Sequence, residues 1–177
     1  MKTVQQFLVA VDGGGSSTRL WVLDIEGRKI AEGRSGPSTV TVVGIDAAVQ
    51  AVADAARAAG LVSGAASGGG LEDNAGSADG ARPIGHVDAV AAAAAVVAGA
   101  DREPEYSGLL GGMERTFPNA RAVLRHDALG ALLGGTLGEP GILLLSGTGS
   151  VCLSLGPEGE QARVGGWGPV PAAVGGG

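Results

Sequence analysis

"VDGGGSSTRLWVLD" (residues 11–24) places one aspartate, three glycines and three hydroxyl residues between two apolar runs. The runs predict strands over Gln6–Val11 and Arg19–Ile25, and a third strand is expected over Arg28–Gly33. A tight hairpin needs only two linking residues, so the loop from Asp12 to Thr18 is longer than a turn requires. Its glycines let the backbone approach an anion closely, and its N–H groups and hydroxyls supply donors. The loop is therefore either a flexible connection or a phosphate-binding loop.

Asp12 adds a second chemical signal to this loop. The lysine and the spacing of the Walker phosphate-binding loop are absent. A carboxylate at a strand end beside phosphates is instead suited to Mg²⁺, which binds through one or two carboxylates plus phosphate oxygens. Asp12 is therefore the candidate metal ligand.

The amino-acid composition of the chain limits the kinds of molecule that it can be expected to bind. The net charge of −6 argues against nucleic-acid and membrane-surface partners, because both need a basic patch. No apolar run is long enough to cross a bilayer, and Asp12 interrupts the first one before a signal-peptide core is complete. The single cysteine, Cys152, excludes an internal disulfide framework and is expected to be a small buried hydrophobe. We expect a cytoplasmic protein.

The rest of the chain alternates helices and strands. A helix is expected from Ile45 to the stop at Gly60, with Ala48, Val52 and Ala55 on its apolar face. Residues 63–85 have few large apolar side chains and predict an exposed, flexible insertion. Residues 93–102 predict a strand that ends at Ala98-Gly99, although their alanines also permit a helix. Further helices are expected over 104–117 and 128–137, and further strands over 120–127, 141–147, 151–156 and 161–166.

A second glycine–hydroxyl loop follows in "GILLLSGTGSVCLSLG" (141–156), again between two apolar strands. The order up to about residue 137 is three strands, then helix, strand, helix, strand and helix, and this segment resembles a second copy of its beginning. Two such loops suggest a duplicated fold that holds one phosphate chain from both sides.

Several motifs, in order, resemble the BadF/BadG/BcrA/BcrD-type ATPases and N-acetylglucosamine kinases of the actin–hexokinase–Hsp70 superfamily. They are "DGGGSSTR" (12–19), "GPSTVTVVG" (36–44), "AGADR" (98–102), "HDALGALLGG" (126–135), "GILLLSGTGS" (141–150) and "GGWG" (165–168). The resemblance implies an α/β, ribonuclease H-like fold of the actin/hexokinase type, with a mixed sheet and flanking helices. It places the first domain over 1–138, with the insertion at 63–85, and the start of a second, incomplete domain over 139–177.

The resemblance also implies roles for individual residues. Asp127 matches the aspartate that takes the proton from the acceptor hydroxyl, although a plain helix N-cap is the alternative for this position. Thr39, Gly99, Gly166 and Trp167 match acceptor-binding positions, and Trp167 has a packed core aromatic as its alternative. The ATP phosphates are assigned to Gly13, Gly14, Gly15, Ser16, Ser17 and Thr18 of the first loop and to Gly147, Thr148, Gly149 and Ser150 of the second.

Three departures from the family pattern qualify these roles. One is the insertion at 63–85, which interrupts a region where a strand is expected. Thr39 stands where the sugar kinases have an asparagine, so the preference for a hexosamine is in question. After "GGWGPV" the chain reads "PAAVGGG", so the adenosine-binding part of the second domain is expected to be missing.

Three functions remain open at the level of sequence. The first is phosphoryl transfer from Mg-ATP to an amino sugar such as N-acetylglucosamine or glucosamine. The second is an ATP-hydrolysing activator of a redox partner, which in the family holds an iron–sulfur cluster through cysteines at a subunit interface. The third is a nucleotide-binding remnant without catalysis. A small-molecule sugar is the expected partner, and a homodimer is left open.

Overall fold

The computed structural model describes residues 5–63, 83–146 and 150–166. Contacts divide the chain into two compact units, Met1–Asp127 and Ala128–Gly177. Within the described ranges, no helix is long and apolar enough to cross a membrane.

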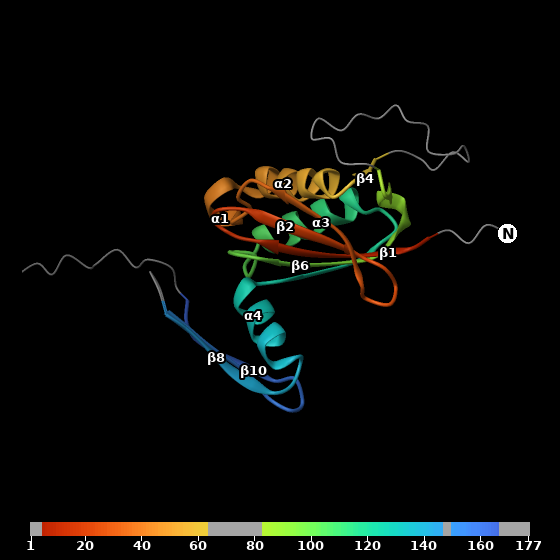
Figure 1. The fold of residues 1–177 in the computed structure, drawn as a ribbon. Helices are drawn as coiled ribbons and strands as arrows, with labels where there is room; N and C mark the ends of the chain where they lie inside the picture. The colour runs from red at the N-terminus through yellow and green to blue at the C-terminus, as the bar shows by residue number, and fades with distance from the viewer. Residues whose placement is uncertain (1–4, 64–82, 147–149, 167–177) are drawn as a thin grey trace, which may run out of the picture. The chain divides into compact units, whose positions relative to one another are not determined.

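The first unit is built on a five-stranded mixed sheet (Figure 1). Its strand order is β3-β2-β1-β6-β7, with β1–β2 and β2–β3 antiparallel and β1–β6 and β6–β7 parallel. The strands are β1 (Phe7–Gly13), β2 (Thr18–Leu23), β3 (Lys29–Ser35), β6 (Val90–Val97) and β7 (Arg121–Arg125). All five were expected from the sequence, with ends shifted by a few residues.

Helices cover one face of this sheet (Figure 1). They are α1 (Val40–Val43), α2 (Ile45–Ala58) and α3 (Glu105–Thr116). The apolar face predicted for α2 is confirmed, since Ala48, Val52 and Ala55 are fully buried. Gly33 lets α2 lie directly on β3, because a Cβ at Gly33 would stand 2.0 Å from the Ala55 carbonyl oxygen.

The sheet alternates between a buried and an open face, as a half-covered sheet does. In β1, Val9 and Val11 are buried, whereas Leu8 and Ala10, which alternate with them, are half-buried. The alanine-rich run that could have formed a helix is strand β6, and its register against β1 puts Ala93 and Ala95 in the core.

The predicted flexible insertion is wrong at its C-terminal end. Gly85–His86 form β5, which pairs in parallel with β4 (Leu61–Val62). The half-buried Ile84 packs against the core and donates its N–H to the Gly60 carbonyl at 2.9 Å. A parallel pairing across a long insertion leaves no local pattern, so the sequence did not indicate it. A 3-10 turn, η1 (Val87–Ala89), leads from β5 into β6. Residues 64–82 lie outside the described ranges.

The second unit is a three-stranded antiparallel sheet, ordered β10-β9-β8, with one helix against it. Its elements are α4 (Asp127–Thr136), β8 (Gly141–Ser146), β9 (Ser150–Leu155) and β10 (Gln161–Gly165). The core joins Ala128, Leu129 and Leu132 of the helix to Leu153 of β9. This packing places the division of the chain at Asp127/Ala128, whereas the sequence suggested a boundary after residue 138.

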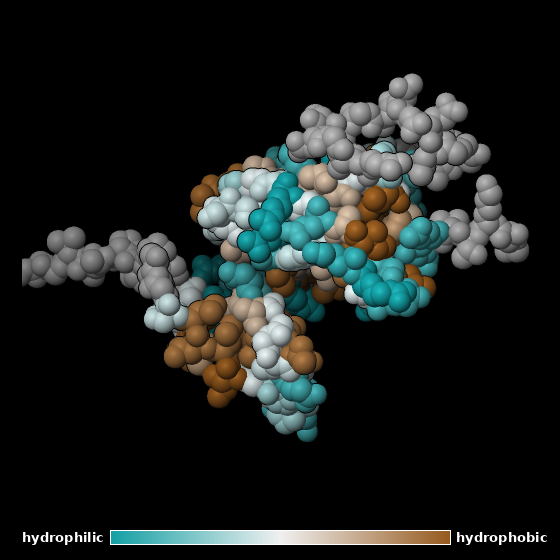
Figure 2. All heavy atoms as spheres, in the orientation of Figure 1, coloured by the Kyte–Doolittle hydropathy of each residue, from teal (hydrophilic) through white to brown (hydrophobic). Residues whose placement is uncertain are grey.

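Apolar side chains also gather on the outer surface of this second unit (Figure 2). Ile142, Leu144 and Val164 are 75%, 71% and 74% exposed. Leu144 and Val164 both pair with Cys152, so they share one row across the sheet. The helix α4 packs on Leu153 and Leu143, which alternate with this row.

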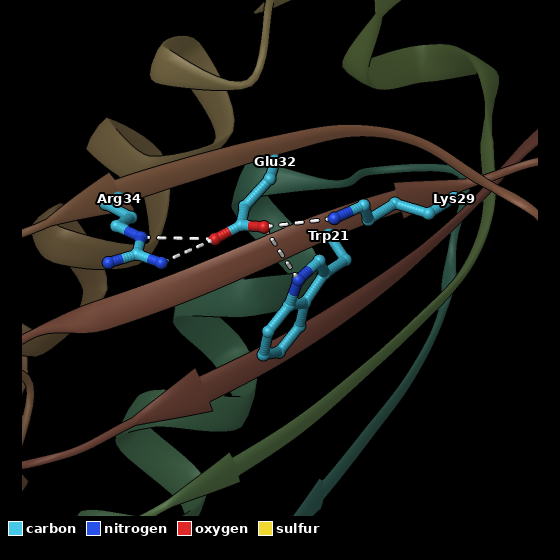
Figure 3. Close-up of polar contacts among 4 residues, drawn as sticks. All are labelled: Trp21, Lys29, Glu32 and Arg34. Atoms are coloured by element: carbon cyan, nitrogen blue, oxygen red, sulfur yellow. Dashed lines mark hydrogen bonds and ion pairs between the residues drawn. The ribbon is translucent and has the colours of Figure 1, made fainter.

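A surface cluster joins β2 to β3 (Figure 3). The Glu32 carboxylate accepts the Trp21 indole N–H at 3.2 Å and contacts Lys29 Nζ at 3.2 Å and Arg34 at 3.0–3.1 Å. The Arg34 guanidinium, followed by Lys29, lowers the pKa of Glu32. The cluster fixes the edge hairpin and lies on the face of the sheet that α2 and α3 leave open.

Candidate phosphate and acceptor site

The candidate site lies where three parallel strands end. β1, β6 and β7 are neighbours, and their carboxyl ends meet at one edge of the sheet. Asp12 pairs with Val96, and Val96 pairs with Arg125, two residues before Asp127. Because neighbouring strands lie about 4.8 Å apart, the strands that carry Asp12 and Asp127 are separated by about 10 Å. The fold thus brings two carboxylates, predicted separately from the sequence, to the same edge.

Asp12 presents its carboxylate to solvent. It is exposed between the buried Val11 and Gly13, so its side chain lies on the open face of the sheet. Among the described residues, none forms an ion pair or hydrogen bond with this carboxylate. A solvent-facing carboxylate beside a candidate phosphate loop is of the kind that suits Mg²⁺, which keeps several waters and takes further oxygens from phosphates.

The loop after Asp12 is open at its tip and anchored at its ends. Gly15 and Ser16 are exposed, and Gly14 and Ser17 are half-buried. Gly14 donates its N–H to the Ser17 carbonyl at 3.1 Å, which closes the loop on itself. The tip therefore offers backbone N–H groups and two serine hydroxyls to an approaching anion.

Thr18 differs from the expectation of a phosphate contact. It is fully buried, and its hydroxyl donates to the Gly36 carbonyl at 2.8 Å. The side chain thus supports the loop from inside and does not face a ligand. The sequence held a signal for this, because Thr18, Leu20 and Val22 follow the period-two pattern of one buried strand face.

Two acceptor positions lie beside the loop. Thr39 is half-buried, and a Cβ at Gly15 would stand 3.7 Å from its Oγ1. Gly99 has a φ of +79°, and a Cβ there would stand 2.9 Å from the Thr41 side chain. Val40 donates its N–H to the Ala98 carbonyl at 3.2 Å. The structure therefore gathers Thr39, Gly99 and the phosphate loop at one edge of the first unit.

Asp127 is exposed and is the first residue of α4. Its carboxylate lies in the first turn of this helix. An accessible carboxylate can accept a proton from a hydroxyl brought within hydrogen-bonding distance.

In the second unit, two candidate residues are neighbours. Gly166 donates its N–H to the carbonyl of Ser150, the exposed first residue of β9, at 2.9 Å. Gly165 has a φ of +80°, and a Cβ there would stand 2.5 Å from the Ser150 oxygen. Gly147, Thr148, Gly149 and Trp167 lie outside the described residues.

One buried polar residue beside the loop was not singled out from the sequence. Ser38 is fully buried, and its Oγ lies 2.8 Å from Thr18 Oγ1. A lone serine next to a proline carries no pattern that distinguishes a buried hydroxyl from an exposed turn.

Comparison with known proteins agrees with the resemblance in the motifs. The model of the BadF/BadG/BcrA/BcrD ATPase family matches residues 9–177. The chain belongs to this family. The ribonuclease H-like α/β fold expected from the motifs is confirmed, and the family is one of ATP-using proteins.

Individual members of the family give closer matches. The chain is 34% identical over 160 residues to glucosamine kinase GspK of Vibrio cholerae serotype O1, covering 90% of this chain and 47% of the relative. It is 28% identical over 167 residues to the N-acetylmuramic acid/N-acetylglucosamine kinase of Clostridium acetobutylicum, covering 93% and 47%. A crystal structure described as a putative N-acetylglucosamine kinase from Chromobacterium violaceum superposes with a TM-score of 0.71 at 27% identity, covering 95% and 51%. The chain thus spans about half the length of the relatives it matches.

Proposed function

We propose that this chain carries the first phosphate loop, the acceptor-binding residues and the catalytic base of an ATP-dependent amino-sugar kinase. The observation that carries the proposal is the placement of Asp12 and Asp127 at the ends of β1 and β7, with the Gly14–Ser17 tip beside Asp12. The names of the two sugar-kinase relatives support the same class of substrate.

The spacing of the strands that carry the two carboxylates suits transfer of a phosphoryl group from one substrate to another. Strands about 10 Å apart leave room for a phosphoryl group and an acceptor hydroxyl between the side chains. In the proposed reaction Asp127 accepts the proton of the sugar hydroxyl as its oxygen forms a bond to the γ-phosphorus. The bond between that phosphorus and the β,γ-bridging oxygen breaks, and ADP leaves with the bond's electron pair.

The remaining residues position the substrates. The backbone N–H groups of Gly15, Ser16 and Ser17 hold phosphate oxygens, because the Gly14 N–H already donates to the Ser17 carbonyl. The motif of the second loop, Gly147–Ser150, assigns it to the same phosphates. Thr39, Gly99, Gly166 and Trp167 contact the sugar. Asp12 would hold the hydrated Mg²⁺ that accompanies ATP, and this ion would supply positive charge against the phosphate oxygens. Because the reaction consumes ATP, we propose that it takes place in the cytoplasm.

Nucleotide turnover against a panel of hexosamines tests the proposal. ADP release is measured for this chain and for a version extended to the length of its relatives, with glucosamine, N-acetylglucosamine and no sugar. We expect sugar-dependent ADP release from the extended protein, abolished by Asp12→Ala. Sugar-independent ATP hydrolysis would favour the activator function, and absence of any turnover would favour a non-catalytic nucleotide-binding role.

A matched pair of variants tests the base. Asp127→Asn should lower turnover by about 10²–10⁴-fold, as is typical when a general base is removed. Asp46→Asn is the control, because Asp46 is an exposed aspartate in the first turn of α2 and its loss removes the same kind of helix-end charge. Equal turnover in the two variants would refute the role of Asp127.

A further inference from the structure

Two buried hydroxyls lie under the phosphate loop. Thr18 and Ser38 are the fully buried polar residues of the described ranges, each 0% exposed. Thr18 Oγ1 lies 2.8 Å from the Gly36 carbonyl oxygen and 2.8 Å from Ser38 Oγ. A hydroxyl has one proton, and a carbonyl can only accept. Thr18 therefore donates to Gly36, and Ser38 donates to Thr18.

Ser38 also holds the first two glycines of the loop. Its N–H donates to the Gly14 carbonyl at 3.0 Å. A Cβ at Gly13 would stand 2.4 Å from Ser38 Oγ, so the bare glycine backbone rests directly on this hydroxyl. Ser38 thus contacts the loop through both its side chain and its backbone.

The same contacts continue to the acceptor side. Val40, two residues after Ser38, donates its N–H to the Ala98 carbonyl at 3.2 Å, and Ala98 donates its N–H to the Gly13 carbonyl at 3.0 Å. Together with the bond from Ser38 to Gly14, these bonds close a ring. The ring runs from Gly13 and Gly14 to Ser38, along the chain to Val40, across to Ala98 and back to Gly13. Thr39 is part of the ring, and Gly99 follows Ala98 directly.

We propose that Ser38 is a positioning residue that couples the phosphate loop to the acceptor-binding residues. The inference rests on the proposed function for its ligands. An anion bound at Gly14–Ser17 restrains the loop, and the loop restrains Ser38 through the contacts above. One peptide bond links Ser38 to Thr39, so the restraint reaches the acceptor side. Nucleotide should therefore raise the affinity for the sugar, and by reciprocity the sugar should raise the affinity for nucleotide by the same factor.

Two variants separate this role from a general contribution to stability. Ser38→Ala removes the hydroxyl beneath the loop. Ser35→Ala is the matched control, because Ser35 is half-buried and its hydroxyl donates at 2.6 Å to the Ala51 carbonyl of α2, outside the ring. Both variants lose one serine hydroxyl of the same protein segment.

The first measurement needs no ligand. Amide hydrogen exchange is followed in the 177-residue chain at Ala98 and Val40, whose N–H groups belong to the ring. Loss of a typical hydrogen bond predicts exchange about two- to tenfold faster in Ser38→Ala. Ser35→Ala should leave both amides unchanged. Equal exchange in wild type and Ser38→Ala would overturn the proposal.

The second measurement tests coupling. The dissociation constant of glucosamine is measured by calorimetry with and without the ATP analogue AMPPNP and Mg²⁺, in this chain and in the extended version. We expect AMPPNP to tighten glucosamine binding at least about fivefold in wild type and Ser35→Ala, the lower end of typical couplings. In Ser38→Ala, which loses the hydroxyl contacts and keeps the backbone bond to Gly14, the tightening should be smaller. Coupling of the wild-type size in Ser38→Ala would overturn the proposal. If wild type binds neither ligand, the proposed function fails, and the exchange rates alone decide whether Ser38 holds the ring.

Discussion

Replacing Gly112 with alanine should force a methyl group of α3 against α2. A Cβ at Gly112 would stand 2.1 Å and 2.9 Å from the two γ-methyl carbons of Val49 and 3.1 Å from its Cβ. Val49 cannot rotate away easily, because a valine in a helix strongly prefers one χ1 rotamer. The helices must therefore separate, or Val49 must adopt a strained conformation.

The neighbouring Gly111 provides the control for helix propensity. Its added Cβ would meet only the flexible end of Arg115, at 3.5 Å. Helix propensity alone should raise the free energy of unfolding by about 0.5–1 kcal/mol in both variants, because alanine loses less backbone entropy than glycine when a helix forms. Only Gly112→Ala adds overpacking, which costs about 1–3 kcal/mol. We expect Gly111→Ala to raise the free energy of unfolding and Gly112→Ala to lower it by about 0.5–2 kcal/mol.

Equilibrium urea unfolding, followed by Trp21 fluorescence, measures the difference. The chain has two tryptophans, so a Trp167→Phe background makes Trp21 on β2 the only reporter. In a Val49→Ala background the obstructing methyls are gone, and Gly112→Ala should then behave like Gly111→Ala. A stabilising Gly112→Ala in the unmodified Val49 background would refute the packing described for α2 and α3.

Three further predictions follow from other parts of the first unit. Asp127→Asn should change the free energy of unfolding by well under about 1 kcal/mol while sugar phosphorylation is lost, and a large drop in melting temperature would contradict this. The lowered pKa of Glu32 stabilises the fold above the ordinary glutamate pKa, so the difference in urea midpoint between wild type and Glu32→Gln should disappear as the pH falls through the lowered value. A difference that persists to about pH 2 would show that charge is not its cause. Gly99→Ala should lower the free energy of unfolding by about 1–3 kcal/mol, because φ at Gly99 is +79° and the Thr41 side chain lies close. A melting temperature equal to that of the wild type would contradict this.

Periodic segments of the fold were predictable from the sequence. The alternation of β1 and β2 and the apolar face of α2 each repeat over enough residues to fix both type and orientation. The pairing of β4 with β5 was not predictable, because Gly85 and His86 are too few to show a period and their partner lies before a long insertion. For the same reason the last residues of that insertion were expected to be flexible.

Only part of the candidate site was predictable from the sequence. Asp12 was singled out because it stands at the end of a strand beside the glycine loop, and Asp127 because it matches a family motif. Their placement at one edge of the sheet became visible only in the structure. Ser38 was not found, because its role depends on contacts with Gly13 and Thr18 that only the folded sheet creates. Thr18 was misplaced because its motif suggested a ligand contact, although its strand alternation indicated burial.

The pairing of β1 has a consequence for the order in which the chain acquires structure during synthesis. Short hairpins join β1 to β2 and β2 to β3, but the other neighbour of β1, β6, begins only at Val90. A nascent chain that has reached Val62 contains the whole Gly13–Thr18 loop, yet Ala98, which donates to the Gly13 carbonyl, has not been made. Non-local parallel pairing forms slowly because its loop-closure entropy is lost before its contacts are gained. The edge that holds the candidate site is therefore completed late, and until then β1 exposes one unpaired backbone edge that a chaperone or another nascent chain can reach.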